Sequence, residues 1–301
     1  GFIGNFASGM DVSNTGIDLG LEGMIVRSDR GFNWTAGLNL NFNRNKLRAL
    51  PTGLNELVIG DRKLIVGESI DQFWIYQNQG IYKTDNEVPL AANGKRMTFE
   101  GTTLKAGDPI WKDVNGDNMI DEQDKSLAGN AMPKLFGGFN NEFKIGNFDL
   151  NFNIIFALGQ KALNQTASSQ YDFINRESAN NINSVKEIYN WQVNVDKEKY
   201  PVYNPWSSVV PYRLEQDLFL ENASYAKLRT VSAGYDLSKT ALFKNMGSNI
   251  KRAYIYFTAN NLLTVTPFSG SDPELIEYNG IYSGYGMPIP RTYTIGVKLD
   301  L

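Results

Sequence analysis

Strict alternation of apolar and polar side chains is the feature that most constrains what this chain can fold into. From Phe148 to Phe156 every second residue is apolar, and most of the residues between them are Asp or Asn. Residues 32–43 and 292–301 repeat the pattern, with mostly Asn, Thr and Gly at the intervening positions. A period of two places the two kinds of side chain on opposite faces of a β-strand. The sequence therefore predicts strands that lie between an apolar and a polar environment.

The length of the alternating runs favours a membrane protein. They extend over roughly 9–12 residues, which matches a tilted strand that crosses a bilayer. Strands of soluble β-sandwiches are usually about 5–6 residues long. Aromatic residues such as Trp34, Phe42 and Tyr293 lie near the ends of the apolar faces, as they do at membrane–water interfaces. The pattern favours an all-β, antiparallel transmembrane barrel, with a soluble sandwich as the alternative.

The lengths of the connections point the same way. We expect seven strands, at about residues 16–27, 31–44, 134–145, 147–159, 223–236, 251–264 and 291–301. Residues 28–30 and 146–147 form tight turns, whereas the connections 45–133, 160–222 and 265–290 are long. Outer-membrane barrels have short periplasmic turns and long extracellular loops. We therefore interpret 45–133 and 160–222 as long extracellular loops.

Seven strands are too few, and odd in number, for a bacterial single-chain barrel, which takes an even number from eight upward. An open sheet in lipid would leave the backbone groups of two edges without hydrogen-bond partners. The chain also begins at Gly1 without an initiator Met or a signal peptide. We expect residues 1–301 to be the C-terminal portion of a larger barrel.

Composition excludes several classes of function. The net charge of -3 argues against a nucleic-acid partner bound through phosphate neutralisation. The chain has no Cys and no His, so disulfides, Cys or His zinc ligands and His-based catalytic triads are excluded. The carboxylates lack the context of a hydrolase pair. We do not expect an enzyme.

Several short stretches, in this order and spacing, resemble the SusC/RagA family of TonB-dependent outer-membrane transporters. They run through most of the chain: Asn14–Leu19, Asn41–Lys46, Val66–Ser69, Gly80–Tyr82, Gly107–Asp108, Asp113–Asp117, Pro133–Lys134, Gly137–Asn141, Ala226–Ser232, Asn260–Leu262, Ser269–Glu274 and Pro290–Thr294. The resemblance implies a 22-stranded barrel with a lumen plugged by an N-terminal domain, which is absent from this chain. About seven of those strands would lie here.

The resemblance also implies a function and partners. These are import of an oligosaccharide or peptide nutrient across the outer membrane, a SusD-like surface lipoprotein, the TonB–ExbB–ExbD complex acting through the missing N-terminal region, and outer-membrane lipid. Two alternatives stay open. One is a soluble calcium-stabilised β-sandwich that binds glycans or mediates adhesion, and the other is a SusC-like structural subunit of an envelope assembly.

One acidic loop has the spacing of a calcium site. Oxygen-bearing side chains lie at positions 1, 3, 5, 9 and 12 of an EF-hand-like loop, and a backbone carbonyl lies at position 7. The candidate ligands of Ca²⁺ are Asp113, Asn115, Asp117, Met119 through its carbonyl, Asp121 and Asp124. Asn118 replaces the usual Gly at position six, and Asp124 replaces the usual Glu. The alternative is a metal-free turn held by Asx hydrogen bonds.

The long connections are also rich in aromatic residues. Exposed rings with polar tips suit stacking on sugars or gripping peptide side chains. The candidate substrate- or partner-binding residues are Trp74, Tyr76, Tyr82, Trp206, Tyr282 and Tyr285. The alternative is that these rings fill the interior of the loops themselves.

Overall fold

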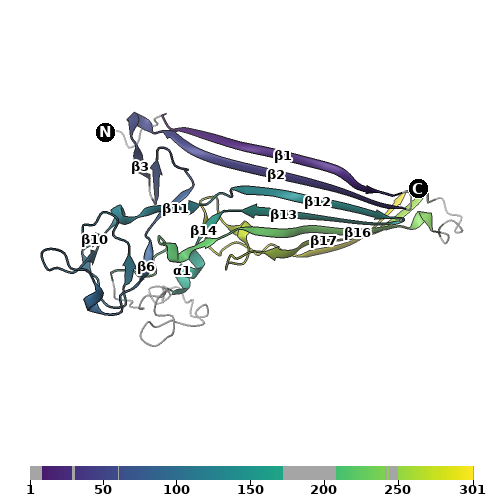
Figure 1. The fold of residues 1–301 in the computed structure, drawn as a ribbon. Coiled ribbons are helices and arrows are strands. Elements are labelled where there is room, and N and C mark those ends of the chain that lie inside the picture. Colours follow the sequence, from purple (N-terminus) through teal and green to yellow (C-terminus); the bar gives the residue numbers. More distant parts are fainter. Residues whose placement is uncertain are drawn as a thin grey trace, which may run out of the picture.

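Seven long strands form one antiparallel sheet in which the spatial order is the order along the chain (Figure 1). They are β1 (Asp11–Arg27), β2 (Phe32–Ala49), β12 (Leu135–Ile145), β13 (Phe148–Leu158), β16 (Tyr225–Asp236), β17 (Arg252–Val265) and β19 (Thr292–Asp300). The computed structural model describes residues 9–28, 31–59, 61–171, 208–240, 243 and 250–300. No helix within these ranges is long and apolar enough to cross a bilayer.

The strand register sorts the side chains of the sheet into an apolar face and a polar face. One apolar row crosses six strands in direct pairing: Leu21, Leu38, Phe139, Ile154, Leu228 and Leu263. Phe148 is 39% exposed and Leu299 is 54% exposed, so no second sheet covers this face in the described part of the chain. The soluble sandwich is therefore not the fold, and the predicted antiparallel sheet of long strands is confirmed.

All seven predicted strands are present, and most of their bounds agree to within two residues. β1 and β2 are longer than expected because Asp11–Gly16 pair with residues 43–49 beyond the last pair that β2 makes with β12. In β16 the register shifts between Leu228 and Thr230, so Arg229 is the extra residue of a bulge.

Two glycines on the polar face make room for tyrosines of β17. Tyr254 lies across Gly234 of β16, and its hydroxyl donates a hydrogen bond of 2.7 Å to Asp149 of β13. Tyr256 lies across Gly296 of β19, and a Cβ atom at either glycine would overlap the ring or its hydroxyl. Aromatic side chains that cover strand glycines fix the register of a sheet.

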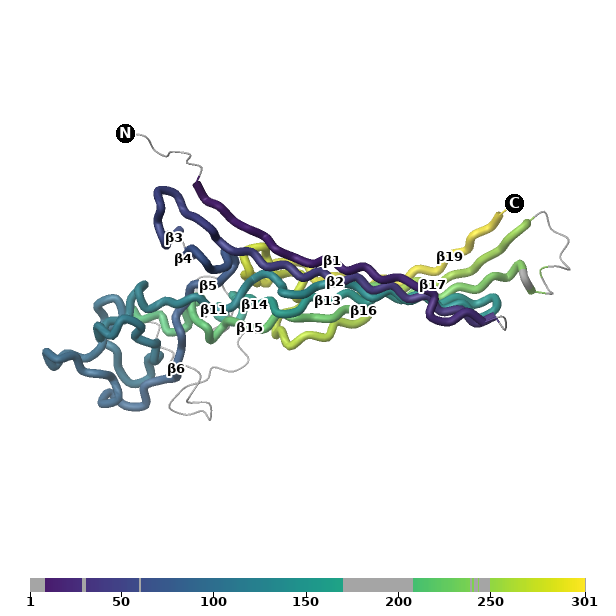
Figure 2. The backbone as a smooth tube through the Cα atoms, turned by 45° about the horizontal axis from the view of Figure 1, so that its top comes forward, coloured from purple at the N-terminus to yellow at the C-terminus, as the bar shows by residue number. Residues whose placement is uncertain are grey.

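The remaining elements gather at the end of the sheet opposite the turn 146–147, and we call them the lobe (Figure 2). The lobe comprises residues 50–134, 159–171, 208–224 and 266–291 of the described chain. Its strands are β3 (Glu56–Ile59), β4 (Arg62–Ile65), β5 (Gln72–Ile75), β6 (Asn78–Ile81), β7 (Thr98–Phe99), β8 (Thr102–Thr103), β9 (Pro109–Trp111), β10 (Met119–Ile120), β11 (Ser126–Asn130), β14 (Lys161–Asn164), β15 (Leu220–Asn222) and β18 (Ile281–Tyr282). Its helical elements are α1 (Gln165–Tyr171) and the 3-10 turns η1 (Pro51–Gly53), η2 (Asp85–Glu87), η3 (Glu122–Asp124), η6 (Asp217–Phe219) and η8 (Pro273–Leu275); a further 3-10 turn, η7 (Leu237–Lys239), follows β16.

The lobe has a hydrophobic core of its own. The buried residues of this core are Tyr76, Tyr82, Val88, Met97, Phe99, Leu104, Trp111, Ile120 and Val209. All except Val209 come from the first long connection, so Val209 ties the second long connection to the first. Aromatic contacts such as Phe99 against Trp111, with ring centroids 4.8 Å apart, make this centre dense.

Candidate functional site

A row of small polar side chains crosses all seven long strands on the polar face. The residues in direct pairing are Glu22, Gly37, Asn140, Asn153, Thr230, Asn260 and Thr292. Asn153 donates to Asn140, Thr230 donates to Asn260 over 3.0 Å, and Asn260 donates to Thr292 over 3.0 Å. Neighbouring strands therefore bond through side chains as well as through the backbone.

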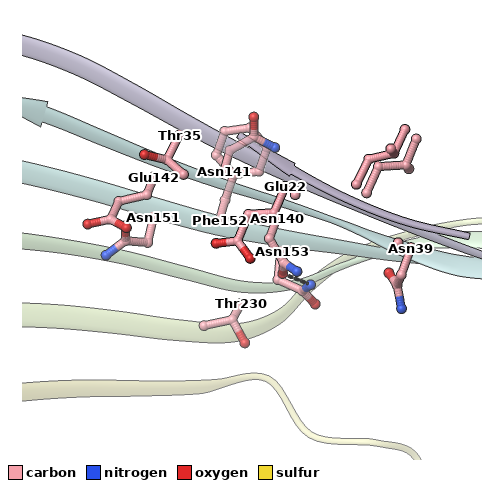
Figure 3. A pocket seen from close by; sticks show the side chains of 14 residues that line it. Glu22, Thr35, Asn39, Asn140, Asn141, Glu142, Asn151, Phe152, Asn153 and Thr230 are labelled. Atoms are coloured by element: carbon pink, nitrogen blue, oxygen red, sulfur yellow. Dashed lines mark hydrogen bonds between the residues drawn. The ribbon is translucent and has the colours of Figure 1, made fainter. Parts of the chain in front are cut away.

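The polar row passes through a hollow of about 600 Å³ (Figure 3). Its polar side chains come from β1, β2, β12, β13 and β16: Glu22, Thr35, Asn39, Asn140, Glu142, Asn151, Asn153 and Thr230. None of the described residues that line it is basic, and Glu142 pairs with Lys144 at 2.7 Å. Amides and hydroxyls both donate and accept hydrogen bonds. The hollow thus suits an uncharged, hydrogen-bonding ligand.

A second hollow of about 310 Å³ lies nearer the turn end of the sheet and is charged. Its lining residues are Glu142, Lys144, Asp149, Arg252, Tyr254, Lys298 and Asp300. Three carboxylates and three cations balance one another there. The polar face is therefore mostly uncharged in the region of the asparagine row, where Glu22 and Glu142 are the acidic lining residues, and it carries both signs of charge closer to the turns.

The structure corrects the role predicted for four of the aromatic residues. Trp74, Tyr76, Tyr82 and Tyr282 have exposed fractions of 5%, 0%, 3% and 5%, so their rings pack inside the lobe and offer no face to a ligand. Burial also raises the pKa of Tyr82 to about 12. Trp206 lies outside the described residues.

Tyr285 is 87% exposed, and its role in binding stays a prediction.

The acidic loop adopts the turn that its spacing predicts. Asp113 accepts hydrogen bonds from the backbone N–H groups of Gly116 and Asn118, at 2.7 and 3.0 Å. Asn118 has a φ of 64°, the left-handed conformation that Gly normally supplies at position six. Asp121 caps η3, and Asp124 accepts from the backbone of Asp121.

The hydrogen bonds of this loop also fit a turn without metal. Within the described ranges, no group of three or more carboxylate, His or Cys side chains is placed to hold a metal ion. The calcium site stays a prediction.

Sequence analysis missed Gln216, which joins the connections on either side of the lobe core. Its side chain is 0% exposed and makes four hydrogen bonds. Its Oε1 accepts from Asn78 and Trp111 at 3.1 and 3.0 Å, and its Nε2 donates to the carbonyls of Pro211 and Arg213 at 2.9 Å. No local signal distinguishes this glutamine from a solvated one.

Motifs that are far apart in the sequence meet at the junction of sheet and lobe. Asn45 accepts hydrogen bonds from the Ser69 hydroxyl at 2.8 Å and from the Ile70 N–H at 3.0 Å. Asn45 and Ser69 border a hollow of about 550 Å³ that Arg44 and Lys134 also line. Three of the stretches that carry the family resemblance are thus parts of one joint.

Comparison with known proteins supports the resemblance. No family model matches the chain. The TonB-dependent receptors P26 and P3 of Formosa agariphila are 28% and 26% identical over 96% of this chain. The TonB-dependent receptor SusC of Bacteroides thetaiotaomicron is 24% identical, also over 96%. The chain is related to SusC-like TonB-dependent receptors. The predicted SusC/RagA resemblance is therefore confirmed.

The solved structure of the RagAB peptide transporter has the same fold over 96% of this chain, with a TM-score of 0.68 and 22% identity. The chain spans only 29% of that transporter chain and 29% of the receptors P3 and P26. The predicted C-terminal portion of a TonB-dependent receptor fits this share. Within it the sheet is open, with β1 and β19 as its edges.

Proposed function

We propose that this chain forms part of the wall of a TonB-dependent outer-membrane transporter that imports an oligosaccharide or peptide nutrient. The observation that carries the proposal is the two-faced sheet of long strands. Its apolar row continues across six strands and its polar row across seven in direct pairing, with the bulge of β16 between the two rows. Lipid-facing and lumen-facing residues alternate in this way in barrels of the outer membrane.

The hollow on the polar face is the proposed place where cargo contacts this part of the wall. Its amides and hydroxyls can form hydrogen bonds with the cargo, and these bonds replace the ones that the cargo makes with water. Because its described lining lacks Lys and Arg, it has no cation that would trap an acidic group. The wall binds and guides cargo without covalent chemistry, so the proposed activity is not enzymatic.

The proposal includes partners beyond this chain. A SusD-like surface lipoprotein would cover the lobe, and the TonB–ExbB–ExbD complex would act through an N-terminal region of the receptor. Outer-membrane lipid would contact the apolar face. The relationship to SusC and the shared fold with the RagAB peptide transporter support these partners and this location.

A deletion strain tests the proposed function. We expect loss of growth on one oligosaccharide or peptide source, restoration by the intact gene, and loss of uptake in the wild type when a protonophore collapses the energy supply. Unchanged growth on every source tried would instead favour a structural subunit of the envelope.

A glycine substitution tests the hollow separately. A Cβ atom at Gly37 would have only ordinary contacts, at 3.8 Å or more, so Gly37→Leu fills the hollow without moving the backbone. We expect uptake to fall at least about tenfold while the barrel still folds. Gly23→Leu is the matched control, because Gly23 pairs with Ala36 on the apolar face and has open space around it. Equal uptake by both variants would exclude the hollow from the route.

A further inference from the structure

A cluster of four charged residues, of which Lys227 and Asp272 are buried, connects β16 to the last segment of the lobe, residues 266–290. Lys227 is 1% exposed, and its Nζ lies 3.0 and 2.8 Å from the two carboxylate oxygens of Asp272. The same Nζ contacts Glu274, which also bonds to the guanidinium of Arg229. Two cations and two carboxylates balance, and every member has an ionic partner.

The local structure on both sides explains how these groups meet. Lys227 pairs with Ile155 of β13 and Thr264 of β17, and the bulge at Arg229 brings a second cation beside it. On the other side, Asp272 caps η8 by accepting from the N–H of Glu274 at 3.0 Å. One capped turn thus presents both carboxylates.

Arg229 is held at its other edge by Asn261. Its Nη1 donates to Asn261 Oδ1 over 3.1 Å, and Asn261 has a φ of 56°. Asn261, with its left-handed backbone, therefore lies on β17 directly beside the bulge residue Arg229 of β16. These two irregularities contribute to one ion cluster.

The segment 266–290 also contacts the other two parts of the lobe. Arg62 donates to the carbonyl of Asn279 at 2.7 Å, and the N–H of Leu163 donates to the carbonyl of Gly280 at 2.9 Å. Ser269 donates to Glu221 through its hydroxyl at 2.7 Å. The segment therefore joins the wall to both long connections.

We propose that Lys227, Arg229, Asp272 and Glu274 form a latch that fixes segment 266–290 to the polar face of the wall. Moving the segment away would break three ion pairs together, and Lys227 would lose both of its carboxylate partners. Breaking ion pairs as little exposed as those of Lys227 costs more than breaking an exposed pair. The segment is then a fixed part of the mouth and not a lid that opens. This inference goes beyond transport itself, because a transporter mouth does not require it.

Hydrogen exchange of the full-length receptor in detergent tests the latch. In Lys227→Met we expect exchange in peptides of 266–290 to rise at least about tenfold, with no change in peptides of β13. Lys227→Arg should restore most of the protection. Lys144→Met is the matched control, since Lys144 is an exposed cation that pairs with Glu142 on the same face.

A second variant covers the case in which Lys227→Met fails to fold. Glu274→Gln removes one charge at the same shape, and the heat-dependent shift of the folded barrel on a gel reports its integrity. Slow exchange of 266–290 in both variants would exclude the latch. Loss of the folded band in both would also overturn it, because the cluster would then hold the whole wall and not one segment. Neither measurement depends on transport.

Discussion

At the scale of single residues, buried polar groups decide how the lobe is held together. The side chain of Gln216 forms hydrogen bonds with Trp111, with Asn78 and with two backbone carbonyl groups. A buried donor or acceptor that loses its partner costs roughly 1–3 kcal/mol.

We expect Gln216→Leu to lower the free energy of unfolding of the lobe by about 3 kcal/mol or more, because several buried groups lose their partner together. Thermal unfolding of the full receptor, followed through lobe tryptophans, measures the change. Gln123→Leu is the control, since Gln123 is exposed. Equal melting of the two variants would contradict the role given to Gln216.

Asp108 makes the stability of the lobe depend on pH. It is 1% exposed, and burial raises the pKa of its carboxyl, although the Lys105 N–H donates to it at 3.0 Å. A raised pKa in the folded state gives stability that is complete below the unfolded value of about 3.9 and is lost as pH rises through the folded pKa.

Asp108→Asn should therefore stabilise the lobe at pH 7 and have no measurable effect at pH 3.5. Melting curves at the two pH values provide the comparison. The exposed Asp61→Asn serves as the control. The same gain at both pH values would show that the effect does not come from ionisation.

At the scale of elements, the acidic loop between β9 and β11 gives the clearest prediction. We expect calorimetric titration of Ca²⁺ into chelator-treated receptor to reveal one site that Asp113→Ala removes and Asp61→Ala retains. The reason is the EF-hand spacing of the oxygen-bearing side chains in the sequence, with Asn118 in the left-handed conformation at position six. Identical heats for wild type and Asp113→Ala would leave the loop as a metal-free turn.

The long strands were predictable from sequence because one face of the sheet is apolar and the other is polar. Each residue of β13 faces either the apolar or the polar face, and the alternation of Phe and Asn records that choice directly. The short strands of the lobe have two to five residues and no such alternation. The parallel pairing of Leu163 with Ile281 depends on contacts between segments far apart in the chain.

For the candidate binding residues too, the sequence did not show which aromatic side chains of the lobe are buried and which are exposed. Tyr76 and Tyr285 both lie in long connections with a glycine nearby, yet one is fully buried and the other is exposed. A ring stabilises a small core as readily as it binds a ligand. The alternation in the sequence predicts that the residues of the polar row share one face. The hollow could not be predicted, because it depends on how five strands pair with one another.

At the scale of the whole molecule, the sheet has two open edges and an apolar face. Ile17 on β1 and Ile295 on β19 are 70% and 77% exposed. Unpaired edges and apolar surface of this kind drive association in water.

We expect residues 1–301 expressed alone to aggregate without detergent, whereas the full-length receptor gives a heat-modifiable barrel in detergent. Size-exclusion chromatography and gel mobility check both parts. A monodisperse monomer of 33.7 kDa in plain buffer would contradict the interpretation of the apolar face.

The shared core of the lobe has a consequence for biogenesis. Val209 packs with residues between Tyr76 and Ile120, so that core joins stretches on either side of the β12–β13 hairpin. A preassembled body of that size does not thread through a bilayer. In the orientation proposed above, with the lobe outside the cell, each stretch would cross the membrane as unfolded chain, and the lobe core would form only after the hairpins that carry it have been inserted.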